Sequence, residues 1–338
     1  MDKKTTLTQQ MAVAQEPEKA IVERKTGTLS WVAQNGIFLF LAVLILVASF
    51  AVNGFATLEN LTSILNRAAP IGIVAVGMTY VVISGNYLDL SVVAQVATAG
   101  VIFLAVGNDY GLFVAALAAF AASLVYGIVN GVAVGYFKAN AVIVTLATTY
   151  IGLGLLRFFS GGSIFFGNPD GPMEQFGQAK LGPIPASTFV LLAITIVLSI
   201  LLTRTNFGFL VKSFGVNEKA TRLAGVNTDR VIVGAFLVTA FAATVAGFVF
   251  AAYSNTAVST MSQGFDFRAL AAIIIGGTSV FGGRGSVLRT LLGVMFVSVL
   301  NNILVLVGIS FGYQQLALGI IILLAVTLDV LSRKLGEK

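Results

Sequence analysis

The sequence predicts an all-α, polytopic membrane protein with about ten transmembrane helices. Of its 338 residues, 57% are hydrophobic and only 10% are charged, whereas a soluble domain carries about 25% charged residues. Apolar runs of about 17–25 residues recur along the chain, and about 20 apolar residues in a helix cross a bilayer. Positive charges are also concentrated on alternate connections, as expected for a chain that crosses a membrane repeatedly.

Residues 1–30 differ from the rest of the chain because they are polar and charged, with almost no apolar periodicity. We expect a disordered tail there, since the segment is too long and too acidic for the n-region of a signal peptide. The first span follows at about 35–53, after Trp31, a suitable interfacial anchor.

Nine further apolar runs complete a single transmembrane domain over residues 31–333, followed by a short tail at 334–338. The long run near 110–137 has room to tilt within the bilayer. An even number of spans places both termini on one side. The runs lie at about 68–84, 89–107, 110–137, 140–160, 186–203, 230–253, 268–283, 287–307 and 313–331.

Lysine and arginine fix the expected orientation. With the N-terminus inside, sixteen of the 20 basic residues fall in cytoplasmic segments, and only Arg67, Arg157, Lys180 and Arg268 fall outside. The positive-inside rule therefore favours cytoplasmic termini, and the net charge of +6 reflects membrane orientation rather than nucleic-acid binding. The longest external connection, 161–185, is rich in Gly and Pro and is either a docking surface or a simple connection.

Composition excludes several kinds of chemistry. The chain contains no Cys and no His, which removes thiolate catalysis, the usual proton shuttle and the commonest metal ligand. A phosphate-binding G-x-x-x-x-G-K-[ST] loop is missing as well. Ser163 has no histidine to activate it. We therefore expect neither an enzyme nor a metal site, and no ATPase site in this chain.

Polar residues inside the spans are mostly amides. Asp89, Asp266 and Asp329 lie near predicted span ends, where a carboxylate can reach water, which argues against a proton- or sodium-driven carrier. Amides can hydrogen-bond a hydroxylated solute, or they can join helices. The adjacent mid-span pair Asn301 and Asn302 is the strongest candidate for a pathway lining. The amides are Gln95, Asn130, Asn301, Asn302, Gln314 and Gln315.

A charged, helix-like segment at 215–225 separates two apolar runs on the cytoplasmic side. Asn217 is a suitable N-cap and Gly225 a suitable residue just past the last turn. The segment is either a docking element for a second protein or a helix resting on lipid headgroups. Its predicted apolar face is Ala220, Leu223 and Ala224, and its polar face is Glu218, Lys219 and Arg222.

Glycines form two patterns. Gly127, Gly131 and Gly135 have the small-x-x-x-small spacing that allows helices to approach closely. A second group predicts a broken helix end at the cytoplasmic face, in a turn formed by Gly276, Gly277, Gly282, Gly283 and Gly285.

Together these residues resemble the membrane permeases of bacterial ATP-binding-cassette sugar importers of the ribose, xylose, arabinose and autoinducer-2 type. The resemblance covers about residues 36–333. It depends on three motifs: Gly215–Gly225, Gly276–Gly285, and Ser84-Gly85 followed by Asp89-Leu90-Ser91-Val92.

The resemblance implies a fold similar to that of the vitamin B12 importer permease, in the bacterial inner membrane. It implies a dimer of permeases, two cytoplasmic ATPase subunits that bind ATP and Mg²⁺, and a periplasmic solute-binding protein. Segment 215–225 would then be the coupling helix on the ATPase. Its implied coupling residues are Asn217, Glu218, Ala220, Arg222, Leu223 and Gly225.

One motif departs from the family pattern. Ser84–Val93 is one residue longer than the usual Ser-Gly-Gly-Ile-Asp-Leu-Ser-Val-Gly and lacks its second and last glycines. The resemblance implies a small sugar as the solute, and this departure leaves a polyol open as the alternative. Gln95 and Asp89 are further candidates for the pathway. The alternative function is a stand-alone carrier or channel for a small polar solute, which would need no ATPase.

Overall fold

The computed structural model describes residues 27–85 and 87–336, so most of the predicted tail at 1–30 lies outside the described residues. The chain divides into two units, residues 1–43 and 44–338. Helix α3 (Gly27–Ala51) begins four residues before Trp31 rather than after it. The second unit contains every other element, and the description below concerns that unit alone.

Seven helices of the described part are long and apolar enough to cross a membrane. They match predicted spans, with α4 beginning ten residues earlier than expected. These helices are α4 (Leu58–Ile83), α5 (Val92–Tyr110), α6 (Leu112–Gly135), α7 (Ala141–Ser160), α9 (Ala186–Arg204), α12 (Thr228–Ser254) and α14 (Val287–Leu306). The others are α8 (Pro172–Gln178), α10 (Asn206–Val216), α11 (Glu218–Leu223), α13 (Phe265–Ile275) and α15 (Phe311–Gly336).

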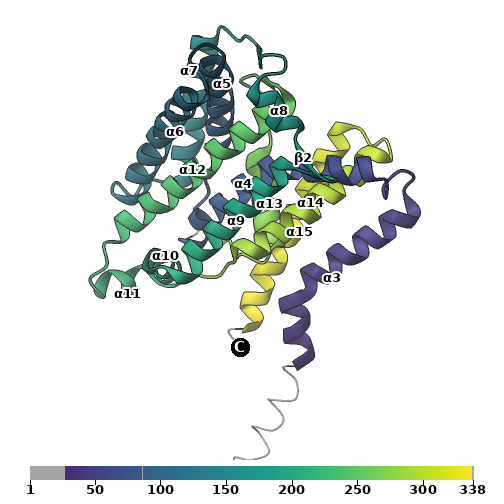
Figure 1. Cartoon of the computed structure of the whole chain (residues 1–338). Coiled ribbons are helices and arrows are strands. Elements are labelled where there is room, and N and C mark those ends of the chain that lie inside the picture. Colours follow the sequence, from purple (N-terminus) through teal and green to yellow (C-terminus); the bar gives the residue numbers. More distant parts are fainter. Residues whose placement is uncertain (1–26, 86, 337–338) are drawn as a thin grey trace, which may run out of the picture. The chain divides into compact units, whose positions relative to one another are not determined.

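Helix α4 forms the centre of the second unit, packed against α9, α12, α13 and α14 (Figure 1). Its neighbour α12 also packs along α5 and α6. The three spaced glycines of α6 face α12, as their spacing predicts. A Cβ at Gly131 would lie 2.8 Å from the Cα of Val233, and one at Gly135 would lie 2.9 Å from the carbonyl oxygen of Asp229. Close backbone packing between these two helices therefore requires glycine.

The predicted span at 268–283 is wrong in extent. Helix α13 ends at Ile275 and has 11 residues, which make only about 16 Å of helix. Gly277 ends it in the left-handed region, with φ of 81°. The N–H of Gly277 donates to Ile274 and that of Thr278 donates to Ile273, the pairing of a Schellman cap. An apolar run could not reveal this stop, because Gly276-Gly277 is followed by further small and apolar residues.

The connection 161–185, predicted to be external, is packed onto the helices. Strand β1 (Phe165–Phe166) pairs antiparallel with β4 (Thr256–Ala257), just beyond the end of α12. Gly177 of α8 lies so close to the backbone of Ala252 that no side chain would fit there. Strands β2 (Lys180–Leu181) and β3 (Ile184–Pro185) form a second short pair that leads into α9. These contacts favour a structural connection in this segment.

Candidate functional site: a polar cavity and a short exposed helix

The charged segment at 215–225 contains a helical break followed by one short helix, as its helix-like sequence predicts. Helix α10 ends at Val216, and Asn217 caps α11 by accepting a hydrogen bond from the N–H of Ala220 at 3.0 Å. Gly225 follows the last turn with φ of 83°. Its N–H donates to Arg222 and that of Val226 donates to Thr221, again a Schellman cap. Both predicted capping residues are confirmed.

The polar side of α11 is engaged within the chain. Arg222 Nη2 lies 2.9 Å from Asp229 Oδ1 and 3.3 Å from Glu218 Oε1. Lys138 Nζ lies 2.7 Å from the same Asp229 oxygen and 3.4 Å from Glu218. These side chains are partly exposed, so each pair contributes only about 0.2–1 kcal/mol. The four charges nevertheless join α11 to the start of α12 and to the connection between α6 and α7.

The apolar side of α11 faces away from the chain. Leu223 is 89% exposed and Val216, just before the break, is 72% exposed. Ala220 and Ala224 are exposed beside Leu223, whereas Thr221 is the buried residue of α11. The predicted separation of an apolar and a polar face is therefore confirmed, and it is the apolar face that is free of intramolecular packing.

Glycines connect this segment to the core. The end of α10, the end of α4 and the turn after α13 meet backbone to backbone. A Cβ on Gly215 would collide with the carbonyl oxygen of Ile83, and one on Gly282 would lie 2.8 Å from the Cα of Gly85. The N–H of Gly283 donates to the Ile83 carbonyl at 2.8 Å. Displacement of α10 and α11 must therefore displace the end of α4, the most buried of the seven long helices.

All five predicted turn glycines lie in this connection between α13 and α14. Gly277, Gly282 and Gly283 have φ of 76–84°, where L-residues are strained. Gly276 instead packs against the backbone of Arg289, and Gly285 packs against the side chain of Ile83. The broken helix end predicted here is confirmed.

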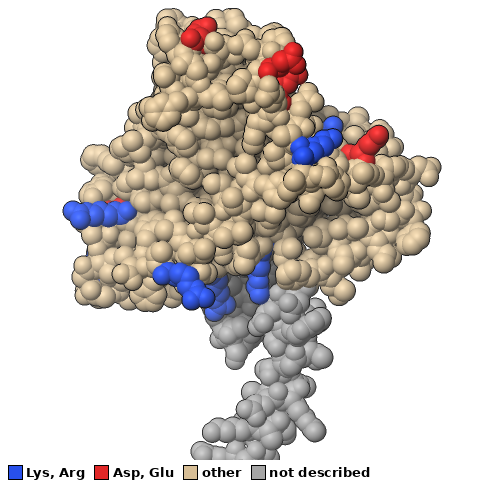
Figure 2. Space-filling view, viewed as in Figure 1, with Lys and Arg blue, Asp and Glu red and all other residues tan. Residues whose placement is uncertain are grey.

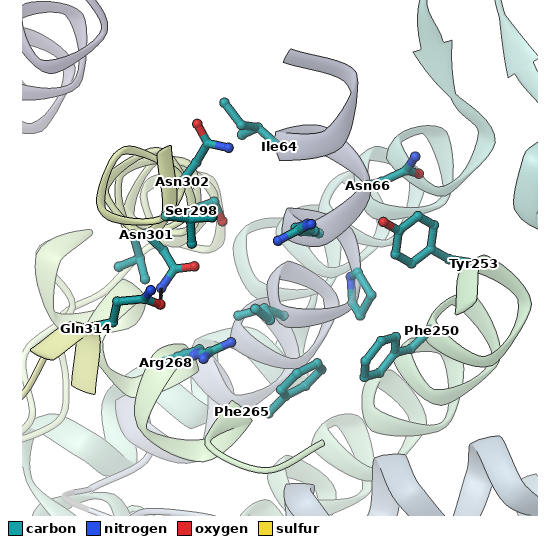
Figure 3. A pocket seen from close by; sticks show the side chains of 15 residues that line it. Ile64, Asn66, Phe250, Tyr253, Phe265, Arg268, Ser298, Asn301, Asn302 and Gln314 are labelled. Carbon is teal, nitrogen blue, oxygen red and sulfur yellow. Dashed lines mark hydrogen bonds between the residues drawn. The ribbon is translucent and has the colours of Figure 1, made fainter. Parts of the chain in front are cut away.

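A cavity of about 270 Å³ lies among α4, the end of α12, α13, α14 and the start of α15 (Figure 3). Figure 3 shows Asn301, Asn302 and Gln314 on one side and Tyr253 and Phe250 opposite them. Its lining is Ile64, Asn66, Arg67, Pro70, Ile71, Phe250, Tyr253, Phe265, Arg268, Val297, Ser298, Asn301, Asn302, Val305 and Gln314.

The predicted asparagine pair therefore lines a cavity, and each member also bonds a neighbouring helix. Asn302 exchanges two amide hydrogen bonds with Asn60 of α4, at 2.7 and 3.0 Å. Asn301 donates one long bond of 3.4 Å to Gln314 of α15. Asn301 is thus the more weakly held of the two amides that face the cavity.

Asp89 and Gln95 lie together elsewhere. The expectation that Asp89 reaches water is wrong, because it is fully buried between α4 and α5. Its carboxylate accepts hydrogen bonds from Ser91 N–H at 3.0 Å and from Gln95 Nε2 at 3.3 Å. Ser91 Oγ in turn accepts from Asn130 Nδ2 at 2.8 Å.

This network holds an irregular stretch of backbone in place. Thr145 and Thr149 of α7 donate to the carbonyls of Leu88 and Leu90, at 3.3 and 3.0 Å. Non-helical backbone at membrane depth requires such partners. Asp89 and Gln95 do not line the cavity described above, so the structure separates them from Asn301 and Asn302.

Sequence reasoning missed two cationic residues of the cavity, Arg67 and Arg268. They were assigned to external connections on the positive-inside rule, yet Arg67 lies inside α4 and Arg268 inside α13. Their position at the very start of apolar runs was the available signal. The aromatic residues Tyr253 and Phe265 were also missed, since single aromatic residues in a span are common.

The membrane-spanning helices and the polar cavity between them are the features of a membrane permease. Within the described residues no group of His, Cys, Asp and Glu could hold a metal ion. Residues 60–326 match the family described as branched-chain amino acid transport system / permease component, and the chain belongs to this family.

Its relatives include permeases of ATP-binding-cassette importers. The chain is 31% identical to the ribose import permease protein of Escherichia coli (strain K12), over 90% of this chain and 96% of the relative. The ribose import permease protein of Bacillus subtilis (strain 168) is 33% identical, over 92% and 98%. The L-arabinose transport system permease protein of E. coli (strain K12) is 32% identical, over 89% and 92%. The resemblance to sugar-importer permeases is confirmed, and no solved structure matches the chain.

Proposed function

We propose that this chain forms the transmembrane pathway for a small sugar or polyol in an importer driven by a separate ATPase. The observation that carries the proposal is the match along nine-tenths of the chain to ribose and arabinose permeases. The cavity supports it chemically. Amides on one wall and Phe250 and Tyr253 on the other are suited to the hydroxyl groups and the apolar ring face of a sugar.

The proposed topology has ten crossings, with both termini in the cytoplasm. Helices α3 and α15, with 25 and 26 residues, would supply two crossings besides the seven long helices. Helix α13 together with its glycine turn would supply the tenth. Figure 2 supports this orientation, because basic side chains gather along the edge where Figure 1 places α10 and α11 and acidic side chains gather at the opposite end. The protein would then be a multi-pass protein of the bacterial inner membrane.

The proposed docking site for the ATPase is the exposed apolar face of α11. Leu223 and Val216 would enter a groove of the ATPase subunit, which itself binds ATP and Mg²⁺. Glu218 and Arg222, occupied with Lys138 and Asp229, would hold α11 at a fixed angle instead of contacting the partner first. The glycine contacts with Ile83 and Gly85 would pass its movement to α4.

The remaining partners complete the proposed transporter. A second copy of this chain would face the first, in a fold similar to that of the vitamin B12 importer permease. A periplasmic binding protein would deliver the solute at the external end. Lipid would surround the exposed apolar faces of α6 and α7, which carry many exposed large hydrophobic side chains.

The test is whether solute uptake by the full chain requires an ATPase. We expect the chain, extracted in mild detergent, to co-purify with a cassette ATPase. We also expect proteoliposomes that contain the chain to accumulate solute only when the ATPase and ATP are inside and the binding protein is outside. Equal accumulation by the chain alone would show a stand-alone carrier or channel and would overturn the proposal.

A further inference from the structure

Two arginines give the cavity a strong positive charge. Arg67, from α4, and Arg268, from α13, both contribute to its lining. Figure 3 shows Arg268 between the amide side of the cavity and Phe265, with its guanidinium directed toward the centre. Arg268 is only partly exposed. The cavity therefore brings two cationic side chains from different helices to one space.

No negative charge compensates them within the part of the chain that the structure describes. The ion pairs found there all involve Lys138 or Arg222. None of the residues that line the cavity is Asp or Glu. Arg67 is exposed and Arg268 is partly buried. A partly buried cation without an acidic partner is costly, and two cations in one cleft produce a focused positive field.

The rest of the lining suits a hydroxylated molecule. The amides of Asn66, Asn301 and Gln314 can donate and accept hydrogen bonds, and Phe250, Phe265 and Tyr253 offer flat apolar surfaces. The volume of about 270 Å³ lies just below the roughly 300–1,000 Å³ of pockets for drug-sized ligands. A solute of monosaccharide size fits this space.

We propose that the cavity binds a sugar that carries an oxyanion, a carboxylate or a phosphate ester, which Arg67 and Arg268 hold while the amides and rings contact the hydroxylated body. A guanidinium pairs with either oxyanion through two parallel hydrogen bonds. Neutral sugars bind less tightly, and amino sugars are repelled. Binding of this sugar is argued from the cavity, whereas its transport rests on the proposed function.

Thiol labelling tests the charge of the cavity. The chain has no Cys, so Ser298→Cys places the sole thiol in the cavity lining, and Ser163→Cys in the exposed external connection is the matched reference. Each variant is treated in membranes with an anionic sulfonatoethyl or a cationic trimethylammonioethyl methanethiosulfonate. For each variant, we divide the labelling rate with the anionic reagent by the labelling rate with the cationic reagent. We expect this ratio to be about tenfold higher at position 298 than at position 163.

Charge removal and salt provide the controls. Adding Arg67→Gln and Arg268→Gln should bring the rate ratio at position 298 to that at 163, and raised salt should reduce the difference. Equal ratios at the two positions, a ratio unchanged by the glutamine variants, or no reaction at 298 with either reagent would each overturn the proposal.

Protection by sugars tests the oxyanion itself. Galacturonate, galactose and galactosamine share one ring and differ in charge. We expect galacturonate to slow labelling at position 298 most and galactosamine least, with the order lost when both arginines are replaced. Equal protection by the three, or none, would contradict the oxyanion site. Because labelling needs neither ATPase nor binding protein, its result is independent of the test of ATP-driven transport.

Discussion

The amide pair between α4 and α14 permits a quantitative test of how Asn301 and Asn302 differ. Replacing Asn302 by Leu removes two hydrogen bonds to Asn60, of 2.7 and 3.0 Å. Hydrogen bonds between membrane helices contribute about 0.6 kcal/mol on average and at most about 1.7 kcal/mol. The loss of both therefore predicts a destabilisation of about 1–3 kcal/mol.

Asn301→Leu is the matched comparison. Asn301 makes one bond of 3.4 Å, which is beyond the usual range of an N–H···O hydrogen bond. We expect Asn301→Leu to lower the free energy of unfolding by well under about 1 kcal/mol. It should nevertheless reduce solute uptake, because this amide faces the cavity and makes only one long hydrogen bond within the protein.

The assay is thermal unfolding in detergent, followed by uptake in proteoliposomes. A change of 1 kcal/mol shifts Tm by roughly 2–4 °C in a protein of 150–250 residues, so Asn302→Leu should lower Tm by several degrees and Asn301→Leu by about a degree. In the double variant Asn60→Leu with Asn302→Leu, neither amide of the pair is left without its partner. The combined loss of stability should therefore be smaller than the sum of the two single losses, although Asn60→Leu also removes the bond from Asn60 Nδ2 to the Phe55 carbonyl, at 2.9 Å. Equal Tm losses for Asn301 and Asn302, or strictly additive losses in the double variant, would refute the reasoning.

Two further predictions concern other parts of the chain. Gly215→Ala should destabilise the protein by about 1–3 kcal/mol and slow uptake, because its Cβ would collide with the Ile83 carbonyl. Gly154 is the control: a Cβ there would have nothing within 4 Å, so Gly154→Ala should change neither thermal unfolding nor uptake. Thiols placed at Ser163 and at the exposed Ala224 should react from opposite sides of the membrane, and reaction of both from outside would contradict the ten-crossing topology.

Much of the helical framework could be predicted because membrane spans are local features. The predicted runs 140–160 and 287–307 agree with α7 and α14 to within one residue. The caps at Asn217 and Gly225 and the glycine face of α6 were also predictable, since each depends on residue types at fixed spacing. Helix α13 was predicted too long because a hydropathy run does not register a Schellman cap within it.

The candidate site was only half predictable. The pair Asn301 and Asn302 was found from polarity within an apolar run. Its separation from Asp89 and Gln95 depends on how α4, α5 and α14 pack, which spacing along the chain does not determine. Arg67 and Arg268 were assigned to external connections because a charge near a span end is usually solvated; only the tertiary structure brings both to one cavity.

The ion pairs of Glu218 and Arg222 with Lys138 and Asp229 could likewise not be predicted from segment 215–225 alone. Their partners Lys138 and Asp229 lie outside 215–225, in the connection after α6 and at the start of α12. A helical wheel distinguishes the apolar from the polar face of α11, but it does not show which face remains free. The structure leaves the apolar face free, with Leu223 at its centre.

ATP-driven uptake by a Leu223→Asp variant tests the central claim most directly. Leu223 is 89% exposed and makes no core contact, so the variant should insert and unfold as the parent chain does. The docked apolar contact would be lost, and we expect at least a tenfold fall in uptake together with loss of co-purifying ATPase. Lys219→Gln, an exposed neighbour on the polar side, should transport normally. Normal uptake and normal ATPase binding by Leu223→Asp would contradict the assignment of α11 as the element that couples ATP hydrolysis to transport.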